Sequence, residues 1–391
     1  MKRGPVKPSG AVRHVLVVGA GTHFLSGMSY YTWKVVSSLS REVDVSAILM
    51  NNLIPKFFYP GRERVGKPLS DVNYDTLPVF DGIDWWWFPS MFRGIAFMRR
   101  QRPDVVLLQW WTGAVAHSYL ALALAARLGG AKVTIEFHES QDVGEARLPL
   151  AQLYAKVMMR LLLHMTSAVV FHSSFDEELV DSNYPISGIS RVTIPHGPYD
   201  QYALKAEEPI RRECPDDCIN ILFFGVIRPF KGLEHLVTAF GLLSAEEVAS
   251  FWLTVVGETW EGWTLPQELI ERHRYADHIT FVNRYVSDQE LAGWLAGADL
   301  VVLPYLRSSS SGPLHTSMSA GLPVIITRVG GLPEAAASYE GAVLIDPDDP
   351  AAILEALRRH IERQGDAKFS DPHSWERSVE RYVHLFNEIS D

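Results

Sequence analysis

The feature that most constrains the fold is an alternation of two hydrophobic periods along nearly the whole chain. Short apolar runs such as HVLVV (14–18) and PDVVLLQ (103–109) alternate with stretches that have helical spacing, such as SYYTWKVVSSLS (29–40). Short apolar runs are typical of buried strands, and an alternation of strands and helices indicates βαβ units around a parallel sheet. The pattern therefore predicts an α/β fold.

This alternation occurs twice. It runs from residue 14 to residue 200 and restarts at INILFFG (219–225), while the segment 201–218 is rich in Pro, Glu, Asp and Arg and has neither period. A length of 391 residues also favours more than one hydrophobic core. We predict two doubly wound domains, 14–200 and 219–371, joined by a linker at 201–218. Such sheets bind ligands at the carboxyl ends of their strands, so we expect the domains to face each other across a cleft.

Composition argues against several classes of protein. The formal net charge of −10 argues against a nucleic-acid partner, because a phosphate backbone needs a basic footprint. No apolar run reaches the roughly 20 residues of a membrane-spanning helix. The basic residues 1–13 lack the apolar core of a signal peptide and are interpreted as a loose tail. Two cysteines, Cys214 and Cys218, are too few for a disulfide framework, which favours a reducing, cytoplasmic compartment.

Two cations stand between a predicted strand and a predicted helix in ILFFGVIRPFKGLEHLVTAF (221–240). Arg228 and Lys231 come where the strand ends and the helix begins, and a helix amino end carries free N–H groups and about half a positive charge. Cations there oppose the helix dipole, so the placement favours a bound anion such as a diphosphate. Gly225 and Gly232 would let the backbone come close to it. The alternative is a solvated loop whose cations pair with nearby Glu.

A second loop has the same layout, in LPYLRSSSSGPLHTSMSAGLPVIIT (303–327). Ser311 or Gly312 is predicted to cap a helix that begins at Pro313, because proline suits the first helical position. Four consecutive serines alone are typical of a flexible loop, but their place beside a candidate anion site favours a binding role. The N–H groups that we expect to be free to face a phosphate are those of Leu314 and His315.

Together these motifs resemble the GT-B glycosyltransferases, and most closely the retaining enzymes called family 4. The resemblance in the carboxyl half lies in FFGVIRPFKG, in the SGPL loop followed by SAGLPVI, and in VGGLPE. The amino half agrees through GAGTHFLSGMS, FHES, SSFDEEL and IPHGPYD. The segment 372–390 resembles the carboxyl-terminal helix that often packs back on the amino domain. The resemblance covers nearly the whole chain and implies two Rossmann-like domains, the second of which binds the donor.

The resemblance implies a hexosyltransferase-type enzyme in glycan, glycolipid or glycosylated-metabolite biosynthesis. It would move a sugar from a UDP-, GDP- or other nucleotide-diphosphate sugar to an acceptor hydroxyl, with retention at the anomeric carbon and without a metal or other cofactor. Arg228 and Lys231 would neutralise the leaving diphosphate. His138 would contact the donor sugar near the reaction centre, unless it is only a histidine satisfied at a strand end. Gly21 or Gly27 would let the first loop approach the diphosphate.

The chain departs from the family pattern at two positions of the second loop. The family commonly carries two glutamates there, one for the donor sugar and one for the ribose, whereas this chain has Ser308 and Thr316. Thr316 could still hydrogen-bond a ribose hydroxyl. The departure leaves the identity of the donor open. It also keeps a second hypothesis, a catalytically silent nucleotide- or sugar-binding homologue or a partner subunit.

Two further motifs suggest other chemistry. GAG at 19–21 begins a dinucleotide-binding fingerprint, but Phe24 replaces its third glycine and no acid ends the second strand. DPDD at 346–349 could hold Mg²⁺ or Mn²⁺. Asp349 lies just before Pro350 and a helical run, however, and is expected to cap that helix.

Aromatic residues suggest where an acceptor binds. QWWTGAVAH (109–117) ends a strand of the amino domain, so Trp110, Trp111 and His117 are candidates for stacking on a sugar or an aglycone. Tryptophans are as often core residues.

Two stretches combine aromatic residues with Arg and Lys, KFFYPGRERVGKP (56–68) and DWWWFPSMFRGIAFMRRQRP (84–103). The second reads as a basic amphipathic helix of the kind that lies in a membrane interface. The hypothesis is a peripheral protein at the inner face of the membrane with a lipid-linked acceptor. The alternative is a packed acceptor loop with a solvated basic face.

Overall fold

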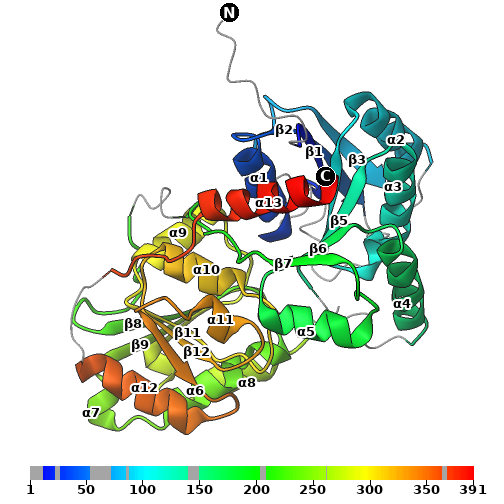
Figure 1. Cartoon of the computed structure of the whole chain (residues 1–391). Helices are drawn as coiled ribbons and strands as arrows, with labels where there is room; N and C mark the ends of the chain where they lie inside the picture. Colours follow the sequence, from blue (N-terminus) through cyan, green and yellow to red (C-terminus); the bar gives the residue numbers. More distant parts are fainter. Residues whose placement is uncertain are drawn as a thin grey trace, which may run out of the picture. The chain divides into compact units, whose positions relative to one another are not determined.

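The computed structural model describes residues 12–22, 27–52, 72–84, 88–139, 149–202, 208–260, 262–362 and 368–391. The chain divides into two compact units (Figure 1). The first unit comprises Met1–Pro195 and Trp375–Asp391, and the second comprises His196–Ser374. Helix α13 (Trp375–Ser390) therefore belongs to the first unit although it follows the second in the sequence.

A seven-stranded parallel sheet forms the centre of the first unit, in the order β3-β2-β1-β4-β5-β6-β7. The central strands are buried along nearly all their length, as expected for a parallel sheet of Val, Ile and Leu covered on both faces. The strands are β1 (His14–Ala20), β2 (Asp44–Asn52), β3 (Val79–Asp84), β4 (Val105–Trp110), β5 (Lys132–Phe137), β6 (Ala168–Phe171) and β7 (Ser190–Thr193).

Two groups of helices cover this sheet. Helix α1 (Gly27–Leu39) packs against α13, while α3 (Ala116–Leu128) packs between α2 (Ser90–Gln101) and α4 (Pro149–Leu163). Figure 1 shows α2, α3 and α4 side by side. All three contribute to one hydrophobic core beneath them. The short helix η3 (Gly113–Val115) precedes α3, and α5 (Ser174–Asn183) follows β6.

The second unit is built around a six-stranded parallel sheet, in the order β10-β9-β8-β11-β12-β13. Its strands are β8 (Ile219–Phe224), β9 (Phe251–Val256), β10 (Ile279–Val282), β11 (Leu300–Leu303), β12 (Val324–Thr327) and β13 (Ala342–Ile345). Its helices are η5 (Pro229–Lys231), α6 (Leu233–Gly241), α7 (Ala245–Val248), α8 (Leu265–Glu271), η6 (Ala276–His278), α9 (Asp288–Ala296), α10 (Gly312–Ser319), α11 (Leu332–Ala335) and α12 (Pro350–Glu362).

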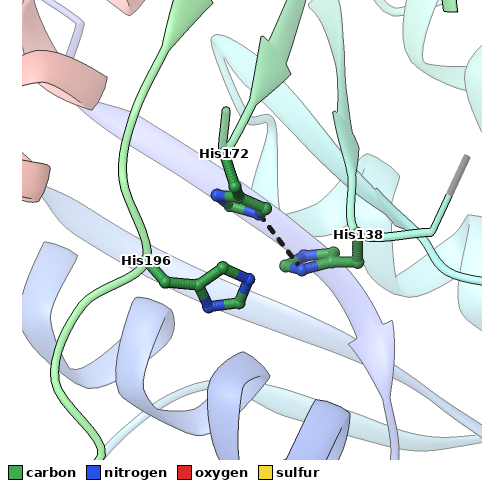
Figure 2. Close-up of side chains that lie close together, drawn as sticks. All are labelled: His138, His172 and His196. Atoms are coloured by element: carbon green, nitrogen blue, oxygen red, sulfur yellow. Dashed lines mark hydrogen bonds between the residues drawn. The ribbon is translucent and has the colours of Figure 1, made fainter. Parts of the chain in front are cut away.

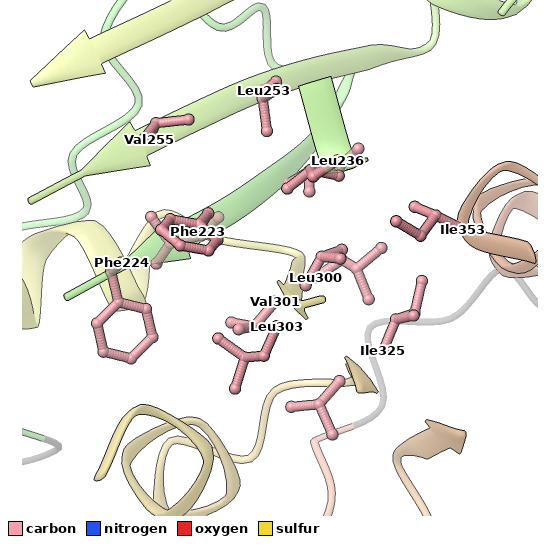
Figure 3. Close-up of a cluster of buried hydrophobic side chains, with 14 of the residues drawn as sticks. Phe223, Phe224, Leu236, Leu253, Val255, Leu300, Val301, Leu303, Ile325 and Ile353 are labelled. Atoms are coloured by element: carbon pink, nitrogen blue, oxygen red, sulfur yellow. The ribbon is translucent and has the colours of Figure 1, made fainter. Parts of the chain in front are cut away.

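The core of the second unit is assembled from strands and helices that are distant in sequence. Figure 3 shows Phe223 of β8, Leu253 of β9 and Leu300 of β11 together with Leu236 of α6 and Ile353 of α12. Every one of these side chains is at most 1% exposed. The apolar face of each element is therefore used to fill one interior.

Both sheets change winding direction at their first strand. β1 lies between β2 and β4, and β8 lies between β9 and β11. The predicted α/β fold with two doubly wound sheets is confirmed. Ligands of such sheets bind beside this switch point, at the carboxyl ends of the strands. We therefore expect a ligand site at the carboxyl ends of β1 and β4 or at those of β8 and β11.

Candidate functional site

The turn after β8 holds the two predicted cations at the switch point of the second sheet. Arg228 is the N-cap of η5 and Lys231 is its last residue, between the end of β8 and the start of α6. Cζ of Arg228 lies 4.7 Å from the ring centre of Trp260, and Nζ of Lys231 lies 3.6 Å from the ring centre of Tyr305. Aromatic faces attract cations, so the rings help to orient both side chains.

Two glycines shape this turn. Gly232 has φ +65°, and a Cβ there would overlap the carbonyl oxygen of Pro304. Gly225 has φ +107°, and a Cβ there would lie 3.3 Å from Cγ of Pro313. Side chains rarely adopt these φ values, so both positions favour glycine. The close approach that they allow is to the loop after β11, and an approach to a diphosphate stays a prediction.

The loop after β11 starts α10 with Ser311 as its N-cap, one of the two predicted positions. Oγ of Ser311 accepts a hydrogen bond from the N–H of Leu314 at 3.2 Å, and its carbonyl oxygen accepts one from the N–H of His315 at 3.1 Å. The prediction that these two N–H groups are free to face a phosphate is therefore wrong, because the cap already uses them. Beside the capped end, a Cβ added to Gly312 would meet open space, and Pro313 occupies the first turn.

At the two positions that lack the family's glutamates, one side chain forms a hydrogen bond within its own loop and the other is buried. Oγ of Ser308 donates a hydrogen bond to the carbonyl oxygen of Ser310 at 2.8 Å. Thr316 lies on α10 and is 3% exposed. Thr316 therefore offers little exposed surface for the predicted contact with a ribose.

In the first unit, His138 follows β5 and belongs to a buried network. Its Nδ1 lies 3.1 Å from Nε2 of His172 (Figure 2), and its Nε2 lies 3.4 Å from Oε2 of Glu136. Nδ1 of His172 lies 2.9 Å from the carbonyl oxygen of Ile194, which can only accept. Nδ1 of His172 is therefore a donor, and in a neutral His172 its Nε2 is the acceptor, so Nδ1 of His138 carries a proton. His196, also drawn in Figure 2, begins the second unit.

Glu136 is completely buried, and three side chains donate hydrogen bonds to its carboxylate. The donors are the hydroxyl of Tyr31 on α1 at 3.0 Å, Nε2 of Gln109 on β4 at 3.0 Å, and the hydroxyl of Tyr382 on α13. Burial alone would raise the pKa of Glu136, but the neighbouring His138, together with the hydrogen bond from Tyr382, lowers the pKa to about 2. Glu136 is therefore a buried carboxylate that is ionised at neutral pH.

The second histidine of the network is neutral. Burial and the neighbouring His138 together lower the pKa of His172 to about 4. A neutral imidazole can accept the hydrogen bond from His138, as the contact with Ile194 requires. The network thus fixes the ring orientation of His138 from two sides, through His172 and through Glu136.

The three predicted acceptor residues have different environments. Trp110 is 6% exposed and belongs to the hydrophobic core, so the prediction that it stacks on an acceptor is wrong for this residue. Trp111 is half-buried and meets Tyr119 edge-on, with ring centres 6.2 Å apart. Nδ1 of His117 lies 2.8 Å from the hydroxyl of Tyr154 on α4. Trp111 and His117 remain as acceptor candidates.

The glycines of the first loop lie at its two ends. The N–H of Gly21 donates to the carbonyl oxygen of Met50 at 2.9 Å, and a Cβ at Gly21 would lie 2.5 Å from that oxygen. Gly27 is the first residue of α1, and residues 23–26 lie outside the described residues. Gly21 is therefore needed for the packing of β1 against β2, and its contact with a diphosphate stays a prediction.

Two family models match the chain. The one described as Glycosyl transferase 4-like domain matches residues 26–197, and the one described as Glycosyl transferases group 1 matches residues 218–363. The chain belongs to the GT-B glycosyltransferases. The turn with Arg228 and Lys231 lies in the group 1 match, and His138 lies in the 4-like match.

Curated relatives and solved structures agree with this assignment. A D-inositol 3-phosphate glycosyltransferase of Streptomyces coelicolor is 27% identical over 306 residues, which cover 67% of this chain and 66% of that protein. This GT-B glycosyltransferase spans 34% of the length of a curated relative from Streptomyces avermitilis and 66% of the length of the one from Streptomyces coelicolor. A glycosyltransferase from Rickettsia africae ESF-5 has the same fold, with a TM-score of 0.69 at 15% identity over 97% of this chain and 98% of that one. Anabaena Alr3699/HepE in complex with UDP and glucose has a TM-score of 0.64 at 14% identity, over 96% and 97%.

Sequence reasoning missed most of the buried network of this GT-B glycosyltransferase. One signal was available: β5 and β6 each end in a Phe that is directly followed by a His, in IEFH and VVFH. The register pairs Glu136 with Val170, so the two Phe-His pairs lie side by side, and the rings of Phe137 and Phe171 stack 5.4 Å apart. A repeated dipeptide on adjacent parallel strands thus points to contact between its members.

Two smaller predictions can also be checked. The N–H of Ala352 donates to Oδ1 of Asp349 at 3.0 Å, which confirms that Asp349 caps α12. Within the described residues, no helix combines the length and the apolar character that crossing a bilayer requires.

Proposed function

We propose that this glycosyltransferase moves a sugar from a nucleotide-diphosphate sugar to an acceptor hydroxyl. The observation that carries the proposal is the pair Arg228 and Lys231 at the end of β8, directly before α6. As the glycosidic bond breaks, negative charge grows on the leaving diphosphate, and two cations with a helix amino end stabilise that charge. The solved complex of Alr3699/HepE with UDP-glucose supports a UDP-sugar as the first donor to test, before GDP- and other nucleotide sugars.

We further propose that transfer retains the configuration at the anomeric carbon and uses no metal or other cofactor. The cationic turn can supply the charge neutralisation that a divalent metal supplies in other folds. The DPDD segment gives a metal little support, since one carboxylate oxygen of Asp349 accepts the N–H of Ala352. Activity that persists in EDTA would support this part of the proposal.

His138 is proposed to contact the donor sugar. The support is its position at the carboxyl end of β5, together with a ring held by His172 and Glu136. A fixed imidazole keeps its geometry when the substrate binds, which favours precise contact with the reacting sugar. Exchange of His138 for Ala is expected to lower turnover more than it weakens nucleotide binding.

The acceptor is proposed to contact Trp111 and His117 of the first unit. The names of the curated relatives make D-inositol 3-phosphate the first acceptor to test. A lipid-linked sugar is the second. We also propose a cytoplasmic location, which the two free, buried cysteines Cys214 and Cys218 support.

Calorimetry with UDP, GDP, ADP and dTDP, each with and without EDTA, tests the donor site. We expect one nucleotide to bind equally well in EDTA and to lose at least tenfold in affinity in Lys231→Ala. The matched control is Lys34→Ala, since Nζ of Lys34 also lies over aromatic rings, 5.6 Å from that of Tyr30 and 5.5 Å from that of Trp33. Absence of binding by all four nucleotides would refute the proposal.

A catalytically silent binding homologue or partner subunit is the second candidate function. It is motivated by Ser308 and Thr316, which stand where the family commonly has acids. Both candidates bind the nucleotide, and only the transferase turns it over. Release of UDP from UDP-glucose in the presence of D-inositol 3-phosphate or a lipid-linked sugar therefore separates them.

A further inference from the structure

The outer side of α2, α3 and α4 exposes large apolar side chains. Leu150 is 82% exposed, Leu128 is 74% exposed and Phe88, which precedes α2, is 71% exposed. Phe92, Leu153 and Leu124 are between 53% and 67% exposed. We call this surface, formed by Phe88 and the exposed side chains of α2, α3 and α4, the α2–α4 face.

These apolar residues are not part of the core. Each of the three helices already buries another side: Met98 of α2, Leu122 of α3 and Met159 of α4 all lie in the same hydrophobic core, at most 2% exposed. Because α3 packs between α2 and α4, the sides opposite this core form one continuous surface. Exposed apolar side chains that gather on one surface are typical of interaction sites.

The charges on the α2–α4 face are all of one sign. Helices α2, α3 and α4 contain no Asp or Glu, although the whole chain has 46 acidic and 36 basic residues. Within the described parts of the chain, none of the face's exposed Arg and Lys side chains forms an ion pair with a carboxylate. These cations are Arg93, Arg99, Arg100, Arg127, Lys156 and Arg160.

The next helix shows that this composition is local. Helix α5 has four acidic residues and no Arg or Lys, in the sequence SFDEELVDSN. A general enrichment in Arg and Lys therefore does not explain the α2–α4 face.

We infer that the α2–α4 face docks on an anionic lipid bilayer. Apolar side chains of a surface helix insert at the boundary between headgroups and acyl chains, while Arg and Lys remain at the anionic headgroups. The combination of cations, exposed leucines and phenylalanines, and the absence of carboxylates from these helices fits that partner. The sequence located this contact in 56–68 and 84–103; the first lies outside the described residues, and the structure adds α3 and α4 to the second.

Sedimentation of the full chain with vesicles tests the inference. The probes are phosphatidylcholine vesicles alone and the same vesicles with phosphatidylglycerol, at low and high salt. We expect binding only to the anionic vesicles, weakened by salt. Arg99→Glu/Arg100→Glu and, separately, Leu150→Ser/Leu153→Ser should each lower vesicle affinity at least tenfold.

Matched changes on the second unit serve as controls. Arg272→Glu/Arg274→Glu changes the net charge by the same amount, and Leu242→Ser/Leu265→Ser removes two exposed leucines. Both should keep vesicle affinity within twofold of the unchanged protein. Circular dichroism verifies that every variant is folded, and UDP calorimetry separates loss of docking from loss of the donor site.

Three outcomes would overturn the inference. The first is no sedimentation with anionic vesicles at low salt. The second is an equal loss in the control variants, which would mean adsorption through overall charge. The third is self-association in ultracentrifugation that the same substitutions on the face abolish, without vesicle binding, which would assign the face to a second copy of the chain.

Discussion

The two units hold charge at the carboxyl ends of their strands in opposite ways. In the first unit, the carboxylate of Glu136 is completely buried and is surrounded by donors from α1, β4 and α13. In the second, Arg228 and Lys231 are half-buried and lie over the rings of Trp260 and Tyr305. A buried charge with fixed partners contributes to folding, whereas the two cations at the helix start are proposed to bind the diphosphate of the donor. Removing charge should therefore harm the fold of the first unit and the binding of the second.

The largest effect is expected for Glu136→Ala. It leaves three buried donors without their acceptor and His138 without its carboxylate, so we expect a loss of about 3–5 kcal/mol in the free energy of unfolding. Urea denaturation measures the loss, and hydrogen exchange should locate it in the first unit. Glu178→Ala, an exposed acid on α5, is the control and should change stability by less than about 0.5 kcal/mol. Equal losses of unfolding free energy in Glu136→Ala and Glu178→Ala would contradict the proposal that the buried charge of Glu136 stabilises the first unit.

Arg228→Ala should weaken nucleotide binding more than it lowers the free energy of unfolding. We expect the proposed nucleotide to bind about 2 kcal/mol more weakly, because a charge-assisted contact is lost. The free energy of unfolding should fall by less than about 1 kcal/mol, the size of a cation–π contact. Calorimetry and urea denaturation measure the two quantities. Arg228→Lys keeps the positive charge and loses the planar guanidinium with its paired N–H donors. It should therefore bind the nucleotide more tightly than Arg228→Ala and less tightly than the unchanged protein. A large loss of stability in Arg228→Ala with unchanged nucleotide affinity would mean that Arg228 supports the fold and not the binding of a ligand.

Lowering the pH should destabilise the first unit through His172. Unfolded His172 takes up a proton below about pH 6.5, whereas in the folded protein its pKa is about 4. The unfolded state binds more protons between these values, so stability that is present above pH 6.5 is lost as the pH falls to 4. Glu136, with a folded pKa of about 2 against 4.5, extends the loss to lower pH.

The expected loss between pH 7 and pH 4 is about 3 kcal/mol. Urea denaturation at a series of pH values measures it. His172→Asn keeps a donor for the carbonyl of Ile194 and has no titrating group, so its profile should be flatter between pH 6.5 and 4. An unchanged profile would show that other groups cause the acid sensitivity.

The smallest expected effect is that of Tyr382→Phe. It removes one of the three donors to Glu136 and keeps the ring, so we expect a loss of about 1 kcal/mol in the free energy of unfolding. Tyr31→Phe removes the donor to the same carboxylate oxygen from α1 and should lose a similar amount. Thermal and urea unfolding of both variants measure this. A loss from Tyr31→Phe alone would mean that α13 adds nothing to the network.

The two sheets could be predicted because their strands carry a purely local signal. Buried parallel strands such as β4 and β8 are continuous apolar runs, and the helices between them repeat apolar residues at i, i+3 and i+4. The N-cap at Ser311 was equally local. The prediction that the following N–H groups are free failed because the serine that begins a helix also binds its first N–H groups.

The network around Glu136 could not be predicted in the same way. Its partners come from α1, β4 and α13, and Tyr382 is 246 residues away along the chain. No spacing or period relates residues at that distance. An acid within the apolar strand TIEF was nevertheless a hint, since a buried carboxylate requires partners from elsewhere in the fold.

The return of α13 to the first unit has a consequence for synthesis on the ribosome. Asn387 accepts a hydrogen bond from the N–H of Val12 at 2.8 Å, and Tyr382 reaches Glu136. Residues 375–391 emerge only after the whole of the second unit has been translated. The second unit, a continuous segment, can complete its interior first, because domains generally fold as units. The nascent first unit, although made earlier, has to wait for its last helix before Glu136 gains its third donor.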